Sequence, residues 1–208
     1  DAFEASAGTS AIGPYAALQR AQCAATLGDW STELNAAQSA LSIEGGGPRL
    51  TQIEALERAA EASQRLGRKQ QALDLYNRSL GLAATRGYTA EMLFTTASVA
   101  RSLGQTDLAA ERFRAIVVDY ADQARGPGAL EALNDLGRGA SISPLQAGLV
   151  RFNAKDYAGA VCDGVRALAG DNRAFVFGHM ADGNLHIVVA AGDDATTRAR
   201  VEQIVDQP

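Results

Sequence analysis

Residues 66–76 read Leu-Gly-Arg-Lys-Gln-Gln-Ala-Leu-Asp-Leu-Tyr, and this stretch decides the fold. Gly67 tolerates the left-handed backbone conformation that ends many helices. A small residue, Ala72, follows five positions later, and a large one, Tyr76, follows one helical turn after that. A small residue lets two helices approach closely where they cross. The stretch therefore predicts a turn between two closely packed helices.

The same turn recurs along the chain, at Leu27-Gly28-Asp29-Trp30, Leu103-Gly104-Gln105-Thr106 and Phe152-Asn153-Ala154-Lys155. The turn positions Gly28, Gly67, Gly104 and Asn153 lie 39, 37 and 49 residues apart. Alanine again follows five residues after the later turns, at Ala109 and Ala158. Recurrent spacing of this kind is typical of stacked helical repeats. The pattern predicts a mainly α fold over residues 14–168, a TPR-like solenoid of antiparallel helix pairs, with an irregular helical bundle as the alternative.

Capping signals predict where two of these helices begin. Thr51-Gln-Ile-Glu54 and Ser143-Pro-Leu-Gln146 both read as capping boxes, in which two side chains satisfy free amides reciprocally. The glycine-rich segments 45–48 and 126–128 are expected to separate helices, with a further helix near 129–136 and a loop over 137–141.

The overall composition excludes some classes of function. Of 208 residues, 47% are hydrophobic and 21% charged, and the net charge of −5 argues against binding to a phosphate backbone. No apolar run reaches the length of a membrane span. Cys23 and Cys162 match no metal or redox motif, so both are expected to be small buried hydrophobes. The large aromatics are expected to lie mostly in the core, with a concave inner face as their second possible place: Tyr15, Trp30, Tyr76, Tyr88 and Tyr120.

The composition changes near Gly170. Residues 174–177 and 185–191 are short runs of strand-forming residues, and Asp182-Gly183-Asn184 between them is a strong turn signal. The pattern predicts a β-hairpin. Asp194 is expected to cap a final helix, 196–205, with an apolar stripe at Val201, Ile204 and Val205.

Three sequence words in the helical part carry a family resemblance: residues 15–23 (Tyr-Ala-Ala-Leu-Gln-Arg-Ala-Gln-Cys), 86–94 (Arg-Gly-Tyr-Thr-Ala-Glu-Met-Leu-Phe) and 142–148 (Ile-Ser-Pro-Leu-Gln-Ala-Gly). Residues 1–168 resemble the helical-repeat region of soluble lytic transglycosylases. The resemblance implies an extracytoplasmic protein whose helices form a wall around peptidoglycan glycan strands. The catalytic domain of that family has no counterpart in the chain, so no catalytic residue is carried over.

The tail carries a different resemblance. Residues 178–186 read Gly-His-Met-Ala-Asp-Gly-Asn-Leu-His, and residues 171–206 resemble the C-terminal domain of FAD-linked oxidases of the D-lactate and glycolate dehydrogenase group. The resemblance implies that His179 and His186 are ligands of a divalent metal. The third family ligand, a downstream Glu, is missing, and two ligands rarely hold a metal. We therefore expect this site to be unoccupied and Asp182, Asp193 and Asp194 to serve turns and caps.

These observations predict a TPR-like domain over 1–170 and a truncated oxidase-like hairpin–helix tail over 171–208. The two halves suggest either a natural fusion or the joining of two sequences. The predicted function is a non-catalytic scaffold for protein or glycan-strand interaction, in an extracytoplasmic compartment. The alternatives are a fragment of a peptidoglycan-cleaving enzyme that is active only with its missing domain, and a fragment of an FAD-linked 2-hydroxyacid dehydrogenase that is inactive alone. No cofactor, catalytic residue, nucleic acid or membrane span is expected.

Overall fold

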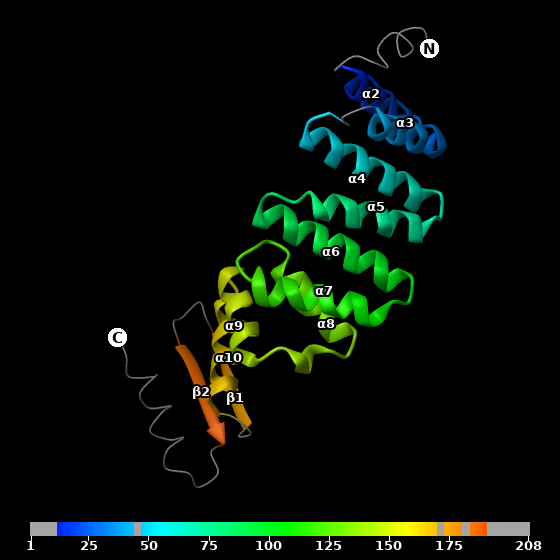
Figure 1. The fold of residues 1–208 in the computed structure, drawn as a ribbon. Helices are drawn as coiled ribbons and strands as arrows, with labels where there is room; N and C mark the ends of the chain where they lie inside the picture. The colour runs from blue at the N-terminus through cyan, green and yellow to red at the C-terminus, as the bar shows by residue number, and fades with distance from the viewer. Residues whose placement is uncertain (1–11, 44–46, 170–172, 180–183, 191–208) are drawn as a thin grey trace. The chain divides into compact units, whose positions relative to one another are not determined.

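The computed structural model describes residues 12–43, 47–169, 173–179 and 184–190 (Figure 1). These residues are mainly helical, which confirms the predicted class. The helices are α2 (Gly13–Thr26), α3 (Trp30–Ser42), α4 (Arg49–Arg65), α5 (Lys69–Gly81), α6 (Arg86–Ser102), α7 (Thr106–Asp119), α8 (Gly126–Asp135), α9 (Pro144–Asn153) and α10 (Tyr157–Ala169). A short 3-10 helix, η1 (Gly139–Ser141), and two strands, β1 (Arg173–His179) and β2 (Asn184–Ala190), complete the order of elements.

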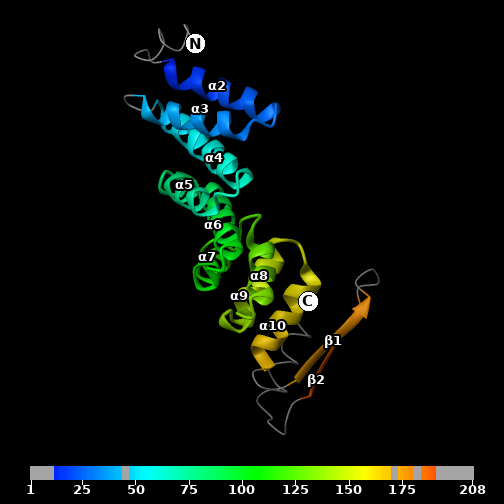
Figure 2. The same cartoon turned by 90° about the vertical axis from the view of Figure 1, so that its right-hand side faces the viewer.

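The chain divides into two compact units, Asp1–Arg112 and Phe113–Pro208. The domain boundary near residue 170 stays a prediction. In the first unit each helix from α2 to α5 packs against the next one along the chain, as Figures 1 and 2 show. This order of contacts follows from the connections of three to six residues, because a helix that reverses direction within so short a turn lies beside its predecessor.

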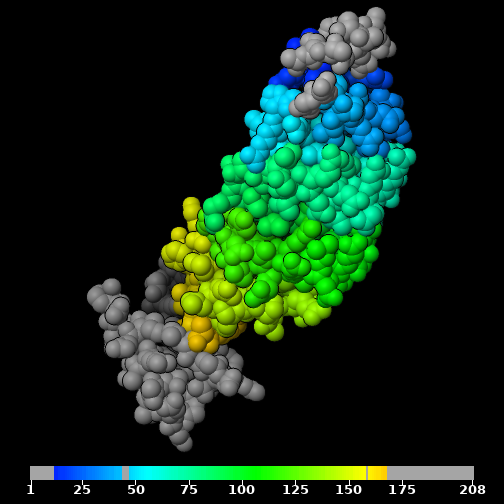
Figure 3. All heavy atoms as spheres, in the orientation of Figure 1, coloured from blue at the N-terminus to red at the C-terminus, as the bar shows by residue number. Residues whose placement is uncertain are grey.

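The interior of the first unit is built largely from alanine. Ala21, Ala37, Ala59 and Ala97 are fully buried, and space-filling atoms close the gaps between the ribbons of successive helices (Figure 3). Both alanines predicted to lie at helix crossings, Ala72 and Ala109, have no exposed surface, which confirms that part of the repeat pattern.

Left-handed residues end the helices where the sequence places its turns. Gly28, Gly67 and Gly104 have φ angles of 73°, 76° and 74°. Each turn closes with the same pair of hydrogen bonds; for example, the amide of Gly67 donates to the Gln64 carbonyl and that of Arg68 to the Ser63 carbonyl. These three predicted turns are confirmed.

The last turn differs from its predicted register. Asn153 is the final residue of α9, and the left-handed residue is Lys155, with φ 65°. The amides of Lys155 and Asp156 make the same closing hydrogen bonds, to Phe152 and Arg151. The last turn therefore lies two residues later than predicted, and Ala160, not Ala158, is five residues beyond the left-handed residue. The side chain of Ala158 lies outside the described part. Gly137 (φ 69°) makes a further turn of this kind, at the start of the segment 137–141 that was expected to be a loop.

One of the two predicted capping boxes is wrong. The helix α4 starts at Arg49 with Pro48 as its N-cap, so Thr51 lies inside the first turn and is buried. The left-handed Gly47 and the fixed φ of Pro48 start the helix earlier than the Thr-x-x-Glu pattern suggests.

The other capping box is confirmed. The Ser143 hydroxyl accepts from the Gln146 amide, and the Gln146 side chain accepts from the Ser143 amide. The helix near 129–136 is present, but it begins at Gly126 because Pro127 is well suited to a first helical turn.

In the second unit α9 and α10 cross at Gly148. A Cβ atom at Gly148 would lie 3.2 Å from the Ala160 carbonyl oxygen, so only glycine allows this approach without a shift. Beside the crossing, the buried Asp163 lies 2.9 Å from Arg151 Nε and accepts a hydrogen bond of 3.0 Å from Arg166.

The strand segments β1 and β2 pair antiparallel, from Arg173 opposite Ala190 to His179 opposite Asn184. Residues 180–183, at the predicted turn, and 191–208, with the predicted final helix, lie outside the described part. The hairpin–helix tail as a unit therefore stays a prediction.

Both cysteines were expected to be buried, and this expectation is wrong: Cys23 is exposed and Cys162 is partly exposed. On α2 the buried positions are Ala21 and Ala24, and residue 23 falls on the opposite side of the helix. Among the described helices, none combines the length and hydropathy that crossing a membrane requires.

Candidate binding pocket in the first unit

The first repeat carries a charged residue where the later repeats carry alanine. Counted five residues from the left-handed glycine, Ala72 and Ala109 correspond to Glu33. Glu33 is only 2% exposed. Glutamate is almost never fully buried unless it is paired, so this departure from the repeat indicates a specific role.

The start of α3 holds Glu33 in place. Asp29 caps the helix: its side chain accepts from the Thr32 amide at 3.0 Å and from the Thr32 hydroxyl at 2.6 Å. These hydrogen bonds, led by that of the Thr32 hydroxyl, lower the pKa of Asp29. The cap fixes the first helical turn, and the buried Leu34 next to Glu33 orients that turn toward the core.

The Glu33 side chain is 2% exposed, and none of the described residues donates a hydrogen bond to its carboxylate, whose oxygens are open to the neighbouring cavity and not sealed in the core. Its ion-pair partner is Arg58, with Nη1 3.9 Å from Oε1, which is too long for a hydrogen bond. Burial raises the pKa of Glu33, and the nearby charge of Glu61 raises it further, against the opposing effect of Arg58 and Arg65. The unfavourable effects on the charged form therefore exceed the favourable ones.

Glu33 borders a cavity of about 570 Å³ between helices of the first unit. Glu33 and Tyr76 are buried, whereas Glu61, Gln64 and Arg65 are exposed, so the cavity has a buried floor and an open rim. The lining residues are Ala25, Trp30, Glu33, Arg58, Glu61, Gln64, Arg65 and Tyr76.

Apart from Glu61, the other polar side chains of the pocket contact one another, Trp30 or Glu54. Arg58 Nε donates to Glu54 at 3.2 Å, and the Tyr76 hydroxyl donates to Gln64 at 3.2 Å. Burial raises the pKa of Tyr76, so its hydroxyl keeps its proton. Trp30 is half-buried and carries the Arg65 guanidinium 5.5 Å from its ring centroid, a cation–π contact. The pocket thus presents one deep carboxylate whose hydrogen-bonding capacity is unused.

A polar network fixes α4, which forms one wall of the pocket. The Tyr88 hydroxyl on α6 donates to Glu57 on α4 at 2.6 Å and lies 2.6 Å from the buried Ser79 hydroxyl on α5. Burial, with the hydrogen bond to Glu57, raises the pKa of Tyr88 to about 12. The network ties three helices together and leaves little freedom for the α4 wall.

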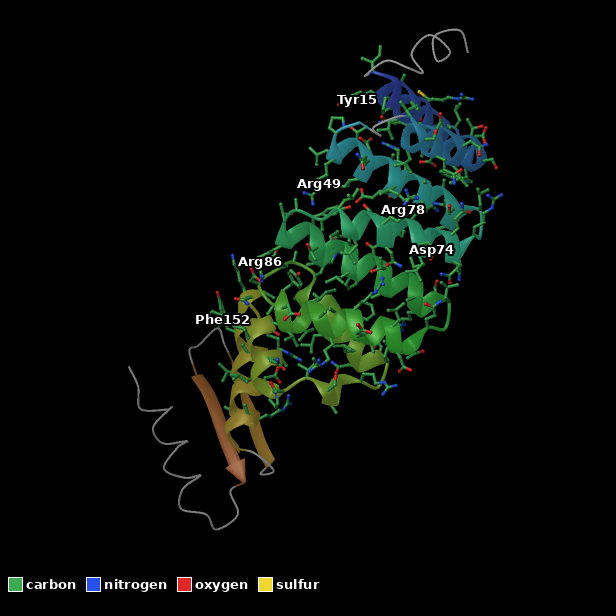
Figure 4. The ribbon with its side chains drawn as sticks, in the orientation of Figure 1. Tyr15, Arg49, Asp74, Arg78, Arg86 and Phe152 are labelled. Carbon is green, nitrogen blue, oxygen red and sulfur yellow. The ribbon has the colours of Figure 1, made fainter. Side chains whose placement is uncertain are left out.

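A second contact holds the other end of α4. Arg49 donates to the carbonyls of Leu82 and Ala83, at 2.6 and 2.8 Å, just beyond the end of α5 (Figure 4). An arginine at this place satisfies carbonyls that the end of a helix leaves free. Together with Tyr88, Arg49 ties α4 to the neighbouring helices at two places.

The predicted metal ligands lie elsewhere, in the second unit. The strand register places His179 opposite Asn184 and His186 opposite Phe177. The side chains of both histidines lie outside the described part, so the metal site stays a prediction. Among the residues that are described, no three His, Cys, Asp or Glu side chains gather closely enough to hold a metal ion.

The sequence indicated part of the pocket. Trp30 and Tyr76 were among the aromatics given a place either in the core or on an inner face, and both line the cavity. Glu33 was missed, although the alignment that identified Ala72 and Ala109 also contains it. The signal was a charged residue at the small-residue position of a single repeat.

Comparison with known protein families gives a match in the tail. Residues 155–208 match the family model described as FAD linked oxidases, C-terminal domain. The match starts at the turn before α10 and covers well under half of the chain. No curated protein matches the chain. The match supports the resemblance of the tail, whereas the lytic transglycosylase resemblance of residues 1–168 is unsupported and stays a prediction.

Proposed function

We propose that the helical part of this chain is a non-catalytic binding scaffold, a solenoid whose pocket beside Glu33 receives a segment of a partner protein. The observation that carries the proposal is the buried carboxylate of Glu33 in the place of a packing alanine. A carboxylate buried without a hydrogen bond costs stability, and such costs persist where function requires them.

The pocket has the features of a binding site. It combines aromatic surface from Trp30 and Tyr76 with a few polar groups, and its volume lies within the usual range of ligand sites. A glycan strand in an extracytoplasmic compartment is the other ligand that the lytic transglycosylase resemblance implies. A buried carboxyl with a raised pKa is also typical of a catalytic acid, so the test must include a cleavage assay.

The single tryptophan of the chain makes the proposal directly testable. Trp30 lines the pocket, so intrinsic fluorescence reports on the pocket and on no other tryptophan. The probes are pools of unstructured peptides sorted by charge, and soluble peptidoglycan strands. We expect at least one peptide pool to change the emission of the wild type saturably and to leave Glu33→Ala unchanged.

A matched control removes the same charge elsewhere. Asp74 is exposed on α5 and outside the pocket lining, so Asp74→Ala should bind as the wild type does (Figure 4). No response to any probe would overturn the proposal. Cleavage of the peptidoglycan strands would overturn its non-catalytic part.

The match of residues 155–208 favours a second candidate function, that of a fragment of an FAD-linked 2-hydroxyacid dehydrogenase. In this hypothesis the chain acts only with a flavin-binding partner. The purified chain, supplied with FAD and either D-lactate or glycolate, should not reduce an acceptor dye. Turnover above that of a heat-denatured sample would show that the chain is an enzyme alone.

A further inference from the structure

The charges around the pocket define what kind of group can enter it. Glu54, Glu57 and Glu61 follow one another at helical spacing on α4, and the pKa of Glu57 is raised by burial and by the charges of Glu61, Glu54 and Glu91. The pocket lining itself holds two carboxylates, Glu33 and Glu61, and two arginines, and Glu54 beside the lining adds a third carboxylate that pairs with Arg58 at 3.2 Å.

Both arginines of the pocket are already committed. Arg58 pairs with Glu54 at 3.2 Å and with Glu33 at 3.9 Å, and Arg65 lies over Trp30. An incoming anion would have to compete with these carboxylates and would be repelled by the negative charges of Glu33 and Glu61. An incoming cation would instead find the hydrogen-bonding capacity of Glu33 unused. The balance of charge therefore favours a cationic group.

The cavity also shows where the cation would lie. The Arg65 guanidinium, 5.5 Å from the Trp30 centroid, shows that this ring accepts a positive charge at its face. Glu33 is the most deeply buried charged residue of the lining, and Glu61 is exposed at the open rim. A group that reaches Glu33 must therefore be long, slender along its stem and charged at its tip.

We propose that the pocket receives a lysine side chain from an extended segment of a partner protein, a proposal that rests on the proposed function. The ammonium group lies between Glu33 and Glu61, and the aliphatic stem lies along Trp30. An ammonium group is a compact charge with three donors, whereas a guanidinium is a wide planar fork that suits a single bidentate carboxylate. The lysine stem buries readily against an aromatic surface. The cavity of about 570 Å³ exceeds one side chain, so the adjoining backbone of the partner enters with it.

Three peptides of equal length provide the test. They differ only at the central residue, which is lysine, acetyl-lysine or glutamate, and all their other residues are uncharged. The readout is the indole NMR signal of ¹⁵N-labelled protein, a single cross-peak because the chain has one tryptophan. We expect the lysine peptide to shift this signal saturably and acetylation to weaken binding at least about tenfold, because it removes the charge that pairs with buried Glu33.

Variants separate this proposal from a general affinity for bases. Glu33→Gln keeps the shape of the side chain and should weaken the lysine peptide at least about tenfold. Asp74→Asn removes a carboxylate outside the pocket and should leave binding unchanged. Equal binding of the lysine and acetyl-lysine peptides, or equal binding by Glu33→Gln, would overturn the proposal.

The failure of this inference is distinguishable from failure of the proposed function. If a neutral or acidic peptide pool shifts Trp30 emission in the wild type and not in Glu33→Ala, the pocket is a binding site but its ligand is not a lysine. If soluble glycan strands do so instead, the ligand is a carbohydrate. If no probe affects Trp30, both proposals are wrong.

Discussion

Replacing Glu33 by alanine should stabilise the first unit while it removes binding. The change gives the first repeat the residue that the others carry at Ala72 and Ala109. The sign of the effect follows from the raised pKa of Glu33: burial and Glu61 disfavour the charged carboxylate more than Arg58 and Arg65 favour it. Removing the charge therefore relieves a net cost of folding.

The size of the effect follows from what is lost and gained. Replacing a whole buried ion pair by apolar residues of similar volume is often neutral or stabilising by about 1–4 kcal/mol, whereas removing one partner of a fully buried pair is destabilising. The lower half of the stabilising range applies here, about 1–2 kcal/mol, because the partner Arg58 is partly exposed and alanine gives up the packing of the side-chain methylenes. Arg58 is not left unpaired, since it keeps Glu54 at 3.2 Å.

Urea denaturation followed by Trp30 emission measures the effect in the unit that contains the mutation. Glu33→Ala should unfold at higher urea than the wild type, and the exposed-site control Asp74→Ala should unfold within about 0.5 kcal/mol of it. Far-UV circular dichroism verifies that the helices of both variants are intact. A Glu33→Ala variant less stable than the wild type would refute the reasoning, because the carboxylate would then serve the fold.

The same prediction has a pH dependence with a definite sign. A carboxyl whose pKa is raised by folding destabilises the native state above that pKa, and the cost disappears as the pH falls through it toward the ordinary value for Glu. The stability advantage of Glu33→Ala should therefore be largest at neutral pH and should shrink on acidification. An advantage that grows as the pH falls would mean that the pKa of Glu33 is lowered instead.

Three further substitutions test the packing. Ala72→Leu should cost about 1–3 kcal/mol by overpacking a fully buried site, and a thermal melt without loss would count against the repeat alignment. Ser143→Ala removes one half of the capping box and should cost about 1 kcal/mol of the stability of the second unit, whereas Ser143→Thr should lose little; urea denaturation followed by far-UV circular dichroism measures both. Asp163→Ala breaks the contacts to Arg151 and Arg166. The expected loss of stability is only about 1–2 kcal/mol, because both arginines reach solvent and Arg151 keeps Asp156 at 3.6 Å. Calorimetry that shows no loss would mean that Asp163 does not stabilise the crossing of α9 and α10.

Local signals in the sequence were enough to place most helix ends. Gly28, Gly67 and Gly104 could be read as turns because glycine adopts positive φ at little cost. Lys155 adopts the same conformation without being glycine, so no residue preference indicated it, and the last repeat was placed two residues early. The start of α4 was missed for a related reason, since Gly47 and Pro48 together outweigh the capping pattern at Thr51.

The pocket depended on contacts that no local pattern contains. An acidic residue in the first turn of a helix is ordinarily a solvated partner of the helix dipole, which is the simplest interpretation of Glu33. Its burial arises from the packing of α3 against α2 and α4, whose residues are distant in sequence. The repeat alignment could have revealed the anomaly, because it compares Glu33 with Ala72 and Ala109 instead of with its neighbours.

In the proposed binding mode, Glu33 is a buried residue whose carboxylate receives a cationic group of a partner. Carbon-13 NMR of the side-chain carboxyl, assigned by the loss of its signal in Glu33→Gln, measures the titration of this residue directly. We predict a pKa above the ordinary value for Glu in the free chain and a fall in that pKa when the lysine peptide is bound, because a nearby positive charge stabilises the carboxylate. A lowered pKa in the free chain, or a pKa that saturating lysine peptide leaves unchanged, would contradict it.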